Sequence, residues 1–313
     1  MRYIQQGSKK GFVLAIVLWI VAAILLGITT IAIFSKDTVS LSQSLQDKLV
    51  TRMESQDVLE GLKFYIITAN FDNISFINSN LKDFTYNFPD RLISDGRWYN
   101  LNDTVKIKLL DTSSLLNIVT ADPNLIAAIA AKNLQNQLKY SIADSIKDWR
   151  DKDNFMHLNG AENSTYELKK KVAYKIRNNR GIQDVEEMRL INGIDSLTIP
   201  QWNAFKGKLY YGFSAGITNL DLIDVKYLAY ILNFSEADAQ ILVDIRSKDL
   251  QKFMNIVYAL PQYNDQYMGF YLTRQIKIEI QVTKNKAKSI LKTMIYFKPT
   301  KDRQYTTVTY AIY

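Results

Sequence analysis

The chain has 313 residues, of which 47% are hydrophobic and 22% charged, with 39 basic residues against 31 acidic ones. This composition is typical of a folded protein with an apolar core, and the length suits an anchor followed by two folded units. The lack of cysteine excludes disulfides, the single histidine excludes multi-histidine metal centres, and a net charge of +8 spread along the chain gives little reason to expect nucleic acid. We expect that histidine, His157, to be exposed in a polar loop, and with no catalytic motif we expect no enzyme.

The amino-terminal segment is a basic flank followed by a long uncharged run. Arg2, Lys9 and Lys10 precede residues 12–34, which carry no charge. At 1.5 Å per residue this run spans about 34 Å, enough to cross a bilayer core. The basic flank keeps residues 1–11 in the cytoplasm and directs the rest outward. A cleaved secretory signal has a shorter apolar core, so we predict a single-pass membrane anchor.

The junction Lys9-Lys10-Gly11-Phe12 resembles the leader of type IV prepilins. This resemblance implies cleavage between Gly11 and Phe12 by a prepilin peptidase, N-methylation of Phe12, and retention of the apolar segment. A plain anchor with an incidental glycine is the alternative. Most pilins have a glutamate at the fifth position of the mature helix, where this chain has Ile16. A carboxylate in the bilayer is expensive unless a neighbouring subunit pairs with it, so Ile16 suggests the first subunit of a filament, with sequence drift as the alternative.

Apolar residues continue at helical spacing beyond the membrane run. They recur every fourth position from Leu41 to Met53 and again from Val58 to Ile66, and no proline precedes Pro89. One helix over about 12–70 would be roughly 90 Å long. We expect its first half in lipid and its second half to lay an apolar stripe on a folded domain.

The rest of the chain changes from strand to helix and back. Residues 96–100 predict a turn and 105–111 an alternating strand, and residues 122–253 have helical periodicity. Alternation then returns at 275–282, 292–297 and 306–312, which predicts three late strands. The early strand needs the late ones to complete a sheet. This pattern predicts an α+β fold, in which a long transmembrane and stalk helix packs on an antiparallel pilin-like sheet with a large, mainly helical insertion. The predicted domains are a leader at 1–11, a transmembrane segment at 12–34, a pilin-like domain at 35–121 and 255–313, and the helical insertion at 122–254.

A block in the insertion, DWRDKDNFMHLNGAENSTY at 148–166, is followed by NNRGIQDVEEMRLINGI at 178–194. Together with the leader and the segment DTSSLLNI at 111–118, it resembles general secretion pathway protein K, a minor pseudopilin family of type II secretion systems. The matching motif residues are Asp148, Trp149, Asp151, Asp153, Gly160, Ala161, Glu162, Tyr166, Asn179, Glu186 and Gly193.

The resemblance implies a non-enzymatic subunit that initiates or caps the periplasmic pseudopilus and supports protein export. It implies the minor pseudopilins I and J as partners, with H as a further candidate, together with the major pseudopilin, the inner-membrane assembly platform and the prepilin peptidase. The expected location is the bacterial inner membrane, with the amino terminus cytoplasmic and the carboxyl-terminal domain periplasmic. No cofactor is required, and calcium is the candidate ion.

Carboxylates crowd the same block, at Asp148, Asp151 and Asp153, with Glu162 nearby. Such an oxygen-rich cluster suits a hard cation such as Ca²⁺, although the spacing is not that of an EF-hand. The structural alternative is a helix end with Trp149 in the core, the two later aspartates capping turns and the glutamate in a salt bridge. Both interpretations stay open, and the sequence favours the structural one.

Residues 185–205 and 217–246 each predict a helix, a short hairpin and a helix, and resemble the helix-hairpin-helix modules that hold DNA phosphates through hairpin amides. A minor pilin-like subunit of a type IV pilus or a DNA-uptake system is therefore the alternative function. The first hairpin keeps one of the usual two glycines, Gly193, and adds Asp195, and the second has none. This loss weakens close approach to phosphate, so packing motifs are the favoured interpretation.

Overall fold

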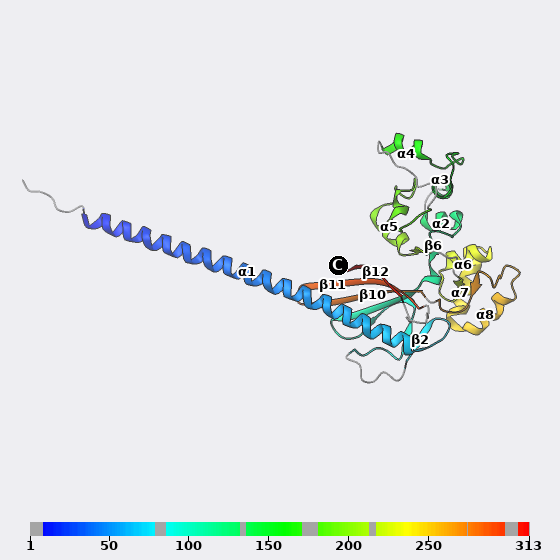
Figure 1. The fold of residues 1–313 in the computed structure, drawn as a ribbon, viewed down its shortest axis with the longest axis horizontal. Coiled ribbons are helices and arrows are strands. Elements are labelled where there is room, and N and C mark those ends of the chain that lie inside the picture. The colour runs from blue at the N-terminus through cyan, green and yellow to red at the C-terminus, as the bar shows by residue number, and fades with distance from the viewer. Residues whose placement is uncertain are drawn as a thin grey trace, which may run out of the picture.

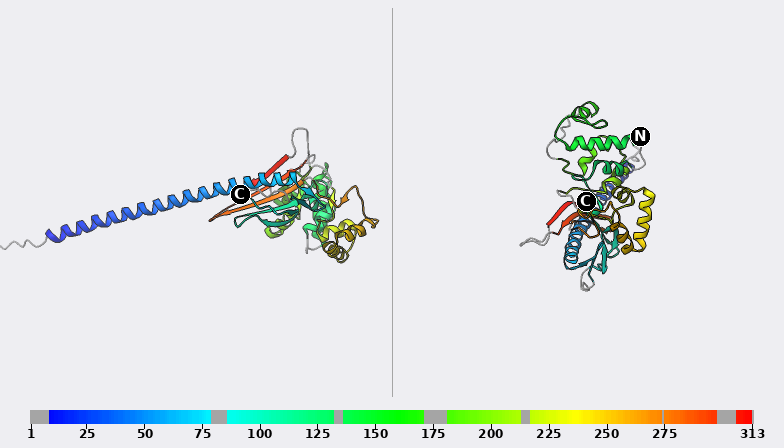
Figure 2. Two further views of the ribbon diagram at one scale, coloured as in Figure 1. Left: turned by 90° about the horizontal axis from the view of Figure 1, so that it is seen from below. Right: turned by 90° about the vertical axis from the view of Figure 1, so that its right-hand side faces the viewer.

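The computed structural model describes residues 9–78, 86–131, 136–170, 181–212, 217–273, 275–297 and 306–312. One very long helix runs into a head made of a five-stranded sheet and a helical part beside it (Figure 1). The helix continues far beyond the head at its amino-terminal end (Figure 2). The α+β fold that the sequence predicts is confirmed.

Helix α1, Lys9–Thr68, forms as one element because it contains no proline. Its 60 residues correspond to about 90 Å. Within the described part of the chain it is the one helix that is long and apolar enough to cross a membrane, and none of its most apolar window is buried inside the protein. These properties are consistent with a membrane anchor.

The folded-domain half of α1 buries one part of the predicted apolar stripe and leaves the other part exposed. Val58 and Leu62 are buried against the sheet, as predicted, but Leu45 and its counterparts Leu41, Leu49 and Met53 are each more than half exposed. The prediction that the residues from Leu41 to Met53 lie on the folded domain is therefore wrong. Leu45 and Val58 are about 3.6 turns apart, which puts them on opposite sides of the helix. We call Leu41, Leu45, Leu49 and Met53 the stalk stripe.

The main sheet has the strand order β12-β11-β10-β5-β4, and every neighbouring pair is antiparallel. Strict alternation in β5 and β10 turns one set of side chains toward α1, including Ile107 opposite Ile280. These side chains and the buried face of α1 form one apolar core. The strands are β4 (Asp95–Asn100), β5 (Val105–Asp111), β10 (Gln275–Lys284), β11 (Ala287–Tyr296) and β12 (Thr306–Ile312).

The sequence missed several short elements. Residues 96–100, expected as a turn, belong to β4, and β11 begins five residues before the predicted start at Lys292. A small three-stranded sheet follows α1, with β1 (Asn70–Phe71), β2 (Ser75–Ile77) and β3 (Arg91–Ile93). Strands of two or three residues carry too little alternation to be recognised.

The insertion, meaning the elements between Asp111 and Gln275, has its own apolar core. Several of its helices begin at side-chain caps, including a capping box at Thr198 and Gln201 and single caps at Asp122 and Ser235. The helices are η1 (Thr112–Ser114), α2 (Pro123–Ala130), α3 (Asn136–Arg150), α4 (Asn163–Lys170), η2 (Glu186–Leu190), α5 (Ile199–Lys206), α6 (Val225–Leu232), α7 (Glu236–Lys248) and α8 (Leu250–Tyr258). Two parallel strand pairs join β6 (Leu116–Asn117) to β7 (Leu209–Tyr210) and β8 (Thr218–Asn219) to β9 (Met268–Gly269).

The chain passes from the sheet into the insertion and later returns to the sheet, and both passages lie beside one buried carboxylate. Asp111 accepts hydrogen bonds from the backbone N–H of Ser113 at 2.8 Å and from the backbone N–H of Thr273 at 2.7 Å. The hydroxyl of Thr273 donates a third, at 2.5 Å. Asp111 therefore ties the outgoing chain to the returning one, 162 residues later.

Candidate metal centre

Helix α3 carries the first acid of the predicted cluster on its buried face. Ile142, Ile146 and Trp149 lie in the core of the insertion, and Asp148, on the same side, is fully buried. The chain then leaves the helix through residues 151–162 and enters α4. A buried carboxylate is unfavourable unless hydrogen bonds or a cation compensate for it, so its surroundings decide its role.

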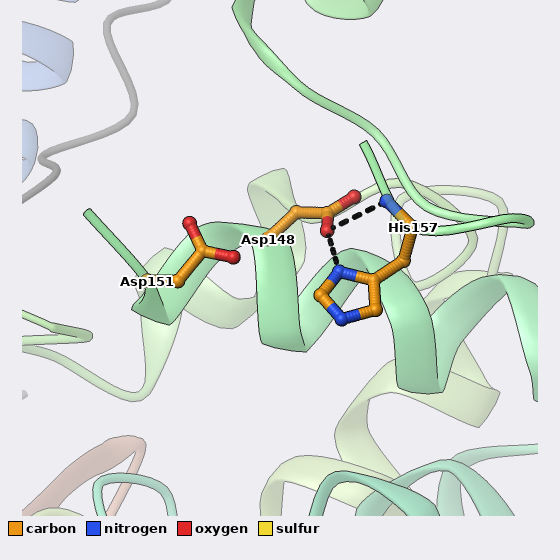
Figure 3. A group of neighbouring side chains, drawn as sticks. All are labelled: Asp148, Asp151 and His157. Atoms are coloured by element: carbon orange, nitrogen blue, oxygen red, sulfur yellow. Dashed lines mark hydrogen bonds and ion pairs between the residues drawn. The ribbon is translucent and has the colours of Figure 1, made fainter. Parts of the chain in front are cut away.

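One oxygen of Asp148 is paired and the other is not. Oδ1 accepts a hydrogen bond from the backbone N–H of His157 at 3.1 Å and is also paired with Nδ1 of the same residue (Figure 3). Oδ2 is buried without a hydrogen-bond partner. Gly160 makes room for this carboxylate, because a Cβ atom there would overlap Oδ2. His157 does lie exposed in a loop, but no spacing rule in the sequence indicated its pairing with Asp148.

Asp144, one turn earlier on α3, holds the returning loop. Its Oδ2 accepts hydrogen bonds from the backbone N–H of Asn159 at 3.2 Å and from the side-chain amide at 3.3 Å. Lys147 Nζ lies 2.9 Å from the other oxygen. Although burial opposes it, the bonds from Lys147 and Asn159 hold the pKa of Asp144 below its ordinary value. Asp144 is thus a fully satisfied anion that fixes the loop, and sequence reasoning did not single it out.

Three further carboxylates close the cluster. Asp151, Asp153 and Glu162 each offer one oxygen within 4.8 Å of those of the other two, and Asp151 lies equally close to ligand atoms of Asp148 and His157. Figure 3 shows the carboxylates of Asp148 and Asp151 side by side. Oδ1 of Asp151 and both carboxylate oxygens of Glu162 are buried without a hydrogen-bond partner. The fold therefore brings together all four acids that the sequence indicated.

The crowding of these acids favours protonation in the ion-free protein. Burial, followed by the charges of Asp148 and Asp151, raises the pKa of Glu162 to about 7. Burial, followed by Asp153 and Asp148, also raises the pKa of Asp151. Low polarity and like charges both disfavour the ionised form, so the cluster retains protons at a higher pH than isolated carboxylates do.

These residues fit a hard divalent cation. Two oxygens that bind one Ca²⁺ at about 2.4 Å each can lie no more than about 4.8 Å apart. Asp151, Asp153 and Glu162 meet this limit among themselves, and Asp151 also meets it with Asp148. A cation would compensate for the unpartnered oxygens of Asp148, Asp151 and Glu162 and would reverse the upward pKa shifts. The set of donors is all carboxylate once His157 is engaged by Asp148, and such a set suits calcium better than zinc.

The structural alternative for the cluster is right for Trp149 and Asp153 and wrong for Glu162. Trp149 lies in the core, where its ring meets Tyr166 edge-on at 5.4 Å and its Nε1 donates to Glu187 at 2.9 Å. Asp153 caps a turn by accepting a hydrogen bond from a backbone N–H two residues later. Glu162, however, forms no salt bridge with any of the described residues. Occupation of the cluster by calcium stays a prediction.

The remaining motif residues have structural surroundings. Ala161 is fully buried beside the cluster. The hydroxyl of Tyr166 accepts a hydrogen bond from the backbone N–H of Asn192 at 3.0 Å, which ties α4 to the turn after η2. Glu186 pairs with a lysine of α5. Asn179 lies outside the described residues.

The two hairpins that resemble DNA-binding modules use their amides inside the protein. A Cβ atom at Gly193, where φ is 90°, would lie 2.7 Å from the side chain of Ile142, so this glycine faces the core. Its N–H donates to Asp195 at 2.9 Å. In the second hairpin, the N–H groups of Asn233 and Phe234 donate to backbone carbonyls of α6. Amides that already have acceptors offer little to a phosphate, which favours the packing interpretation.

The processing junction lies at the start of α1. The helix begins at Lys9, so Gly11 and Phe12 fall in its first turn, and residues 1–8 lie outside the described part. Ile16 lies within the apolar segment with its side chain partly exposed. Cleavage at Gly11, methylation of Phe12 and the tip position suggested by Ile16 remain predictions.

Comparison with known proteins finds a match to a family model and matches to solved structures. Residues 99–203 match the family model of the type II secretion system (T2SS), protein K. A chain in the crystal structure of the GspK-GspI-GspJ complex from the enterotoxigenic Escherichia coli type 2 secretion system shares the fold. That match has a TM-score of 0.53 and 16% identity, and covers 88% of this chain and 99% of the other. No curated protein matches the sequence. The resemblance to the protein K family is confirmed, and the matched residues include the whole acidic cluster.

Proposed function

We propose that this chain, which resembles type II secretion protein K, is a membrane-anchored minor pseudopilin that takes part in the assembly of a pseudopilus. The match of residues 99–203 and the shared fold support this proposal. The observation that carries it is the form of α1, a single helix that is long and apolar enough to cross a membrane, reaches the head and keeps an apolar face free of the sheet. Its task is assembly, and no catalytic step belongs to the proposal.

The stalk stripe supplies the surface for assembly. It begins seven residues beyond Phe34, the end of the apolar run, and Leu41 to Met53 span about 18 Å along the helix. A large apolar strip on the aqueous side of a membrane is unfavourable unless a partner covers it. A partner helix that reaches this level beside α1 has to rise from the same membrane, and other pilin-like subunits have that form.

The partners follow from the solved relative. The structure that shares this fold is a complex of GspK with GspI and GspJ, so we assign the minor pseudopilins I and J as the partners of this chain. Minor pseudopilin H, the major pseudopilin, the assembly platform and the prepilin peptidase complete the set. The basic flank supports an orientation with the amino terminus in the cytoplasm and the head in the periplasm.

Two features support a terminal position in the filament. Ile16 removes the carboxylate that would need a neighbour in lipid. The insertion widens the head at the end away from the membrane (Figure 1). A subunit with this shape would begin or cap the pseudopilus, and would act there in protein export.

The acidic cluster would bind calcium in a structural role. Asp148, Asp151, Asp153 and Glu162 would hold the ion, which supplies positive charge where several buried oxygens lack a partner. Bound in this way, it would fix the loop between α3 and α4 to the core of the insertion.

The assembly proposal is tested with the full chain extracted in detergent and co-purified with I and J. We expect Leu45→Glu with Leu49→Glu to reduce recovery of the partners about tenfold or more, because two charges would replace the centre of the apolar strip. Gln46→Glu with Lys48→Glu changes exposed residues beside the stripe and is the matched control. Equal recovery with both pairs of substitutions would contradict the proposal. Mass spectrometry of the same preparation should show a chain that starts at N-methylated Phe12.

A further inference from the structure

The end of the molecule farthest from the amino-terminal end of α1 is made by α8 and the loop that joins it to β9 (Figures 1 and 2). This segment, YALPQYNDQYMGFY at 258–271, contains four tyrosines and one charged residue, Asp265. Tyr258, Tyr267 and Tyr271 expose 51%, 58% and 49% of their surface. Neither the stalk stripe nor the acidic cluster involves these residues.

Two of the four tyrosines, Tyr258 and Tyr263, belong to a cluster of aromatic rings. The ring of Tyr258 lies 5.0 Å from that of Tyr263 and 5.0 Å from that of Phe270, measured between centroids. Tyr263 stacks on Phe270 at an interplanar angle of 18°. Phe270 in turn packs edge-on at 5.9 Å against Phe253, which is fully buried. The rings of Tyr258 and Tyr263 therefore continue the core of the insertion.

Backbone hydrogen bonds fix the same loop. The N–H groups of Tyr267 and Met268 both donate to the carbonyl of Asn264, at 3.1 and 2.8 Å. The carbonyl of Tyr267 accepts from the N–H of Thr218 at 2.8 Å, which joins the loop to the β8–β9 pair. A loop ordered before binding loses little conformational freedom when a partner docks on it.

The chemistry of this surface is that of protein recognition. Tyrosine offers a large contact area and a hydroxyl at the expense of two side-chain torsions, and it is enriched among the residues that dominate binding energy. Exposed amides at Gln262, Asn264 and Gln266 add adaptable hydrogen bonding. The one charge of the segment is the carboxylate of Asp265, which does not suit an anionic lipid surface. These properties fit a protein with an uncharged, hydrogen-bonding face.

We propose that Tyr258, Tyr263, Tyr267 and Tyr271, the distal tyrosine surface, dock a partner protein end-on at the side of the chain that faces away from its membrane anchor. The partner presents an uncharged face, so the contact is insensitive to salt. This role goes beyond filament assembly, because the surface lies at the opposite end of the molecule from the membrane segment and apart from the stalk stripe.

The test is site-specific photo-crosslinking of the full chain in its own membrane, with Tyr267→p-benzoylphenylalanine. Tyr140, in α3, has a similar exposure of 62% and receives the same substitution as a control. We expect a discrete adduct with another protein at position 267 and none at position 140. The adduct should persist at ~0.5 M salt. Addition of Tyr258→Ser and Tyr271→Ser should reduce its yield about tenfold or more.

Several results would overturn the proposal. These are no adduct above the level at position 140, adducts to lipid or glycan alone, adducts to pseudopilins I or J alone, or adducts to a second copy of the chain alone. The variant with Tyr258→Ser and Tyr271→Ser should still co-purify with I and J and should keep its melting temperature. Loss of that co-purification would instead concern the proposed role in filament assembly. The docking proposal and the assembly proposal can therefore be contradicted independently.

Discussion

The sheet region and the insertion both enclose apolar cores, yet they differ in the charge that they bury. In the sheet region, the buried side-chain atoms without a hydrogen bond among the described residues are the hydroxyls of Ser94 and Ser289. In the insertion they include ionisable groups, namely oxygens of Asp148, Asp151, Glu162 and Asp221 and the Nε atom of Arg150. A neutral hydroxyl is a small defect, whereas a cluster of unpaired carboxylates needs protons or a cation. The sheet region is therefore self-sufficient, and the insertion depends on its solution conditions.

The strongest test of whether the sheet region is stable independently of calcium is Ile280→Ala. Ile280 is fully buried in β10, paired with Ile107 on one side and Leu291 on the other. Removing three carbons there should lower the free energy of unfolding by about 2–5 kcal/mol, measured by urea denaturation. Gln281→Ala, on the outward side of the same strand, should change it by about 0.5 kcal/mol or less. The loss at Ile280 should be the same with calcium and with a chelator, and a calcium-dependent loss would break the comparison.

Calcium should raise the free energy of unfolding of the insertion by an amount comparable to the loss expected for Ile280→Ala. An ion at 100 times its Kd that binds the folded state alone stabilises it by about 2.7 kcal/mol, or roughly 5–10 °C in Tm for a unit of this size. Asp151→Asn with Asp153→Asn should abolish the shift, because two of the four carboxylates are lost. Calorimetry with calcium and with a chelator measures it. If wild type shows no shift, the cluster is structural.

Gly160→Ala offers a second way to block the ion. The new methyl group would overlap the unpaired oxygen of Asp148 and force that carboxylate out of the cluster, so the calcium shift should disappear. Gly207→Ala is the matched control, since a Cβ atom there lies 3.5 Å from the nearest backbone oxygens and φ is −59°. That variant should respond to calcium as wild type does. A full response in Gly160→Ala would show that the ion binds elsewhere.

The two regions also differ in how far the sequence predicted them. Period-two alternation over residues such as 275–282 identified the late strands and their need for an early partner. It does so because apolar residues lie on the buried face of a sheet and polar residues on the exposed face. The stalk stripe was misassigned because four-residue spacing shows that a face is apolar but not what covers it. The acids of the cluster were found by composition, whereas the pairing of His157 with Asp148 was not. That contact joins residues nine positions apart, and it depends on the path of the loop that Asp144 and Asn159 hold.

The smallest expected effect is the pH dependence that the acids of the insertion contribute. The pKa of Glu162 is about 7 in the folded protein against about 4.3 in an unfolded chain, so between these values the folded state binds more protons. Its contribution to stability is therefore complete at low pH and is lost as pH rises through 7. Burial raises the pKa of Asp221 to about 6, with the same sign. In a chelator, Tm should fall by several degrees between pH 5 and about 7.5, and Glu162→Gln should flatten the upper part of this fall while leaving the part due to Asp221. Calcium should remove the dependence on Glu162 by favouring its ionised form, and calcium affinity should itself weaken below pH 7 as that carboxylate takes up a proton. In the chelator, Glu162→Gln and wild type could instead show the same pH profile. That result would mean that Glu162 is already ionised in the folded protein. The insertion would then tolerate a buried charge as well as the sheet region tolerates its unpaired hydroxyls.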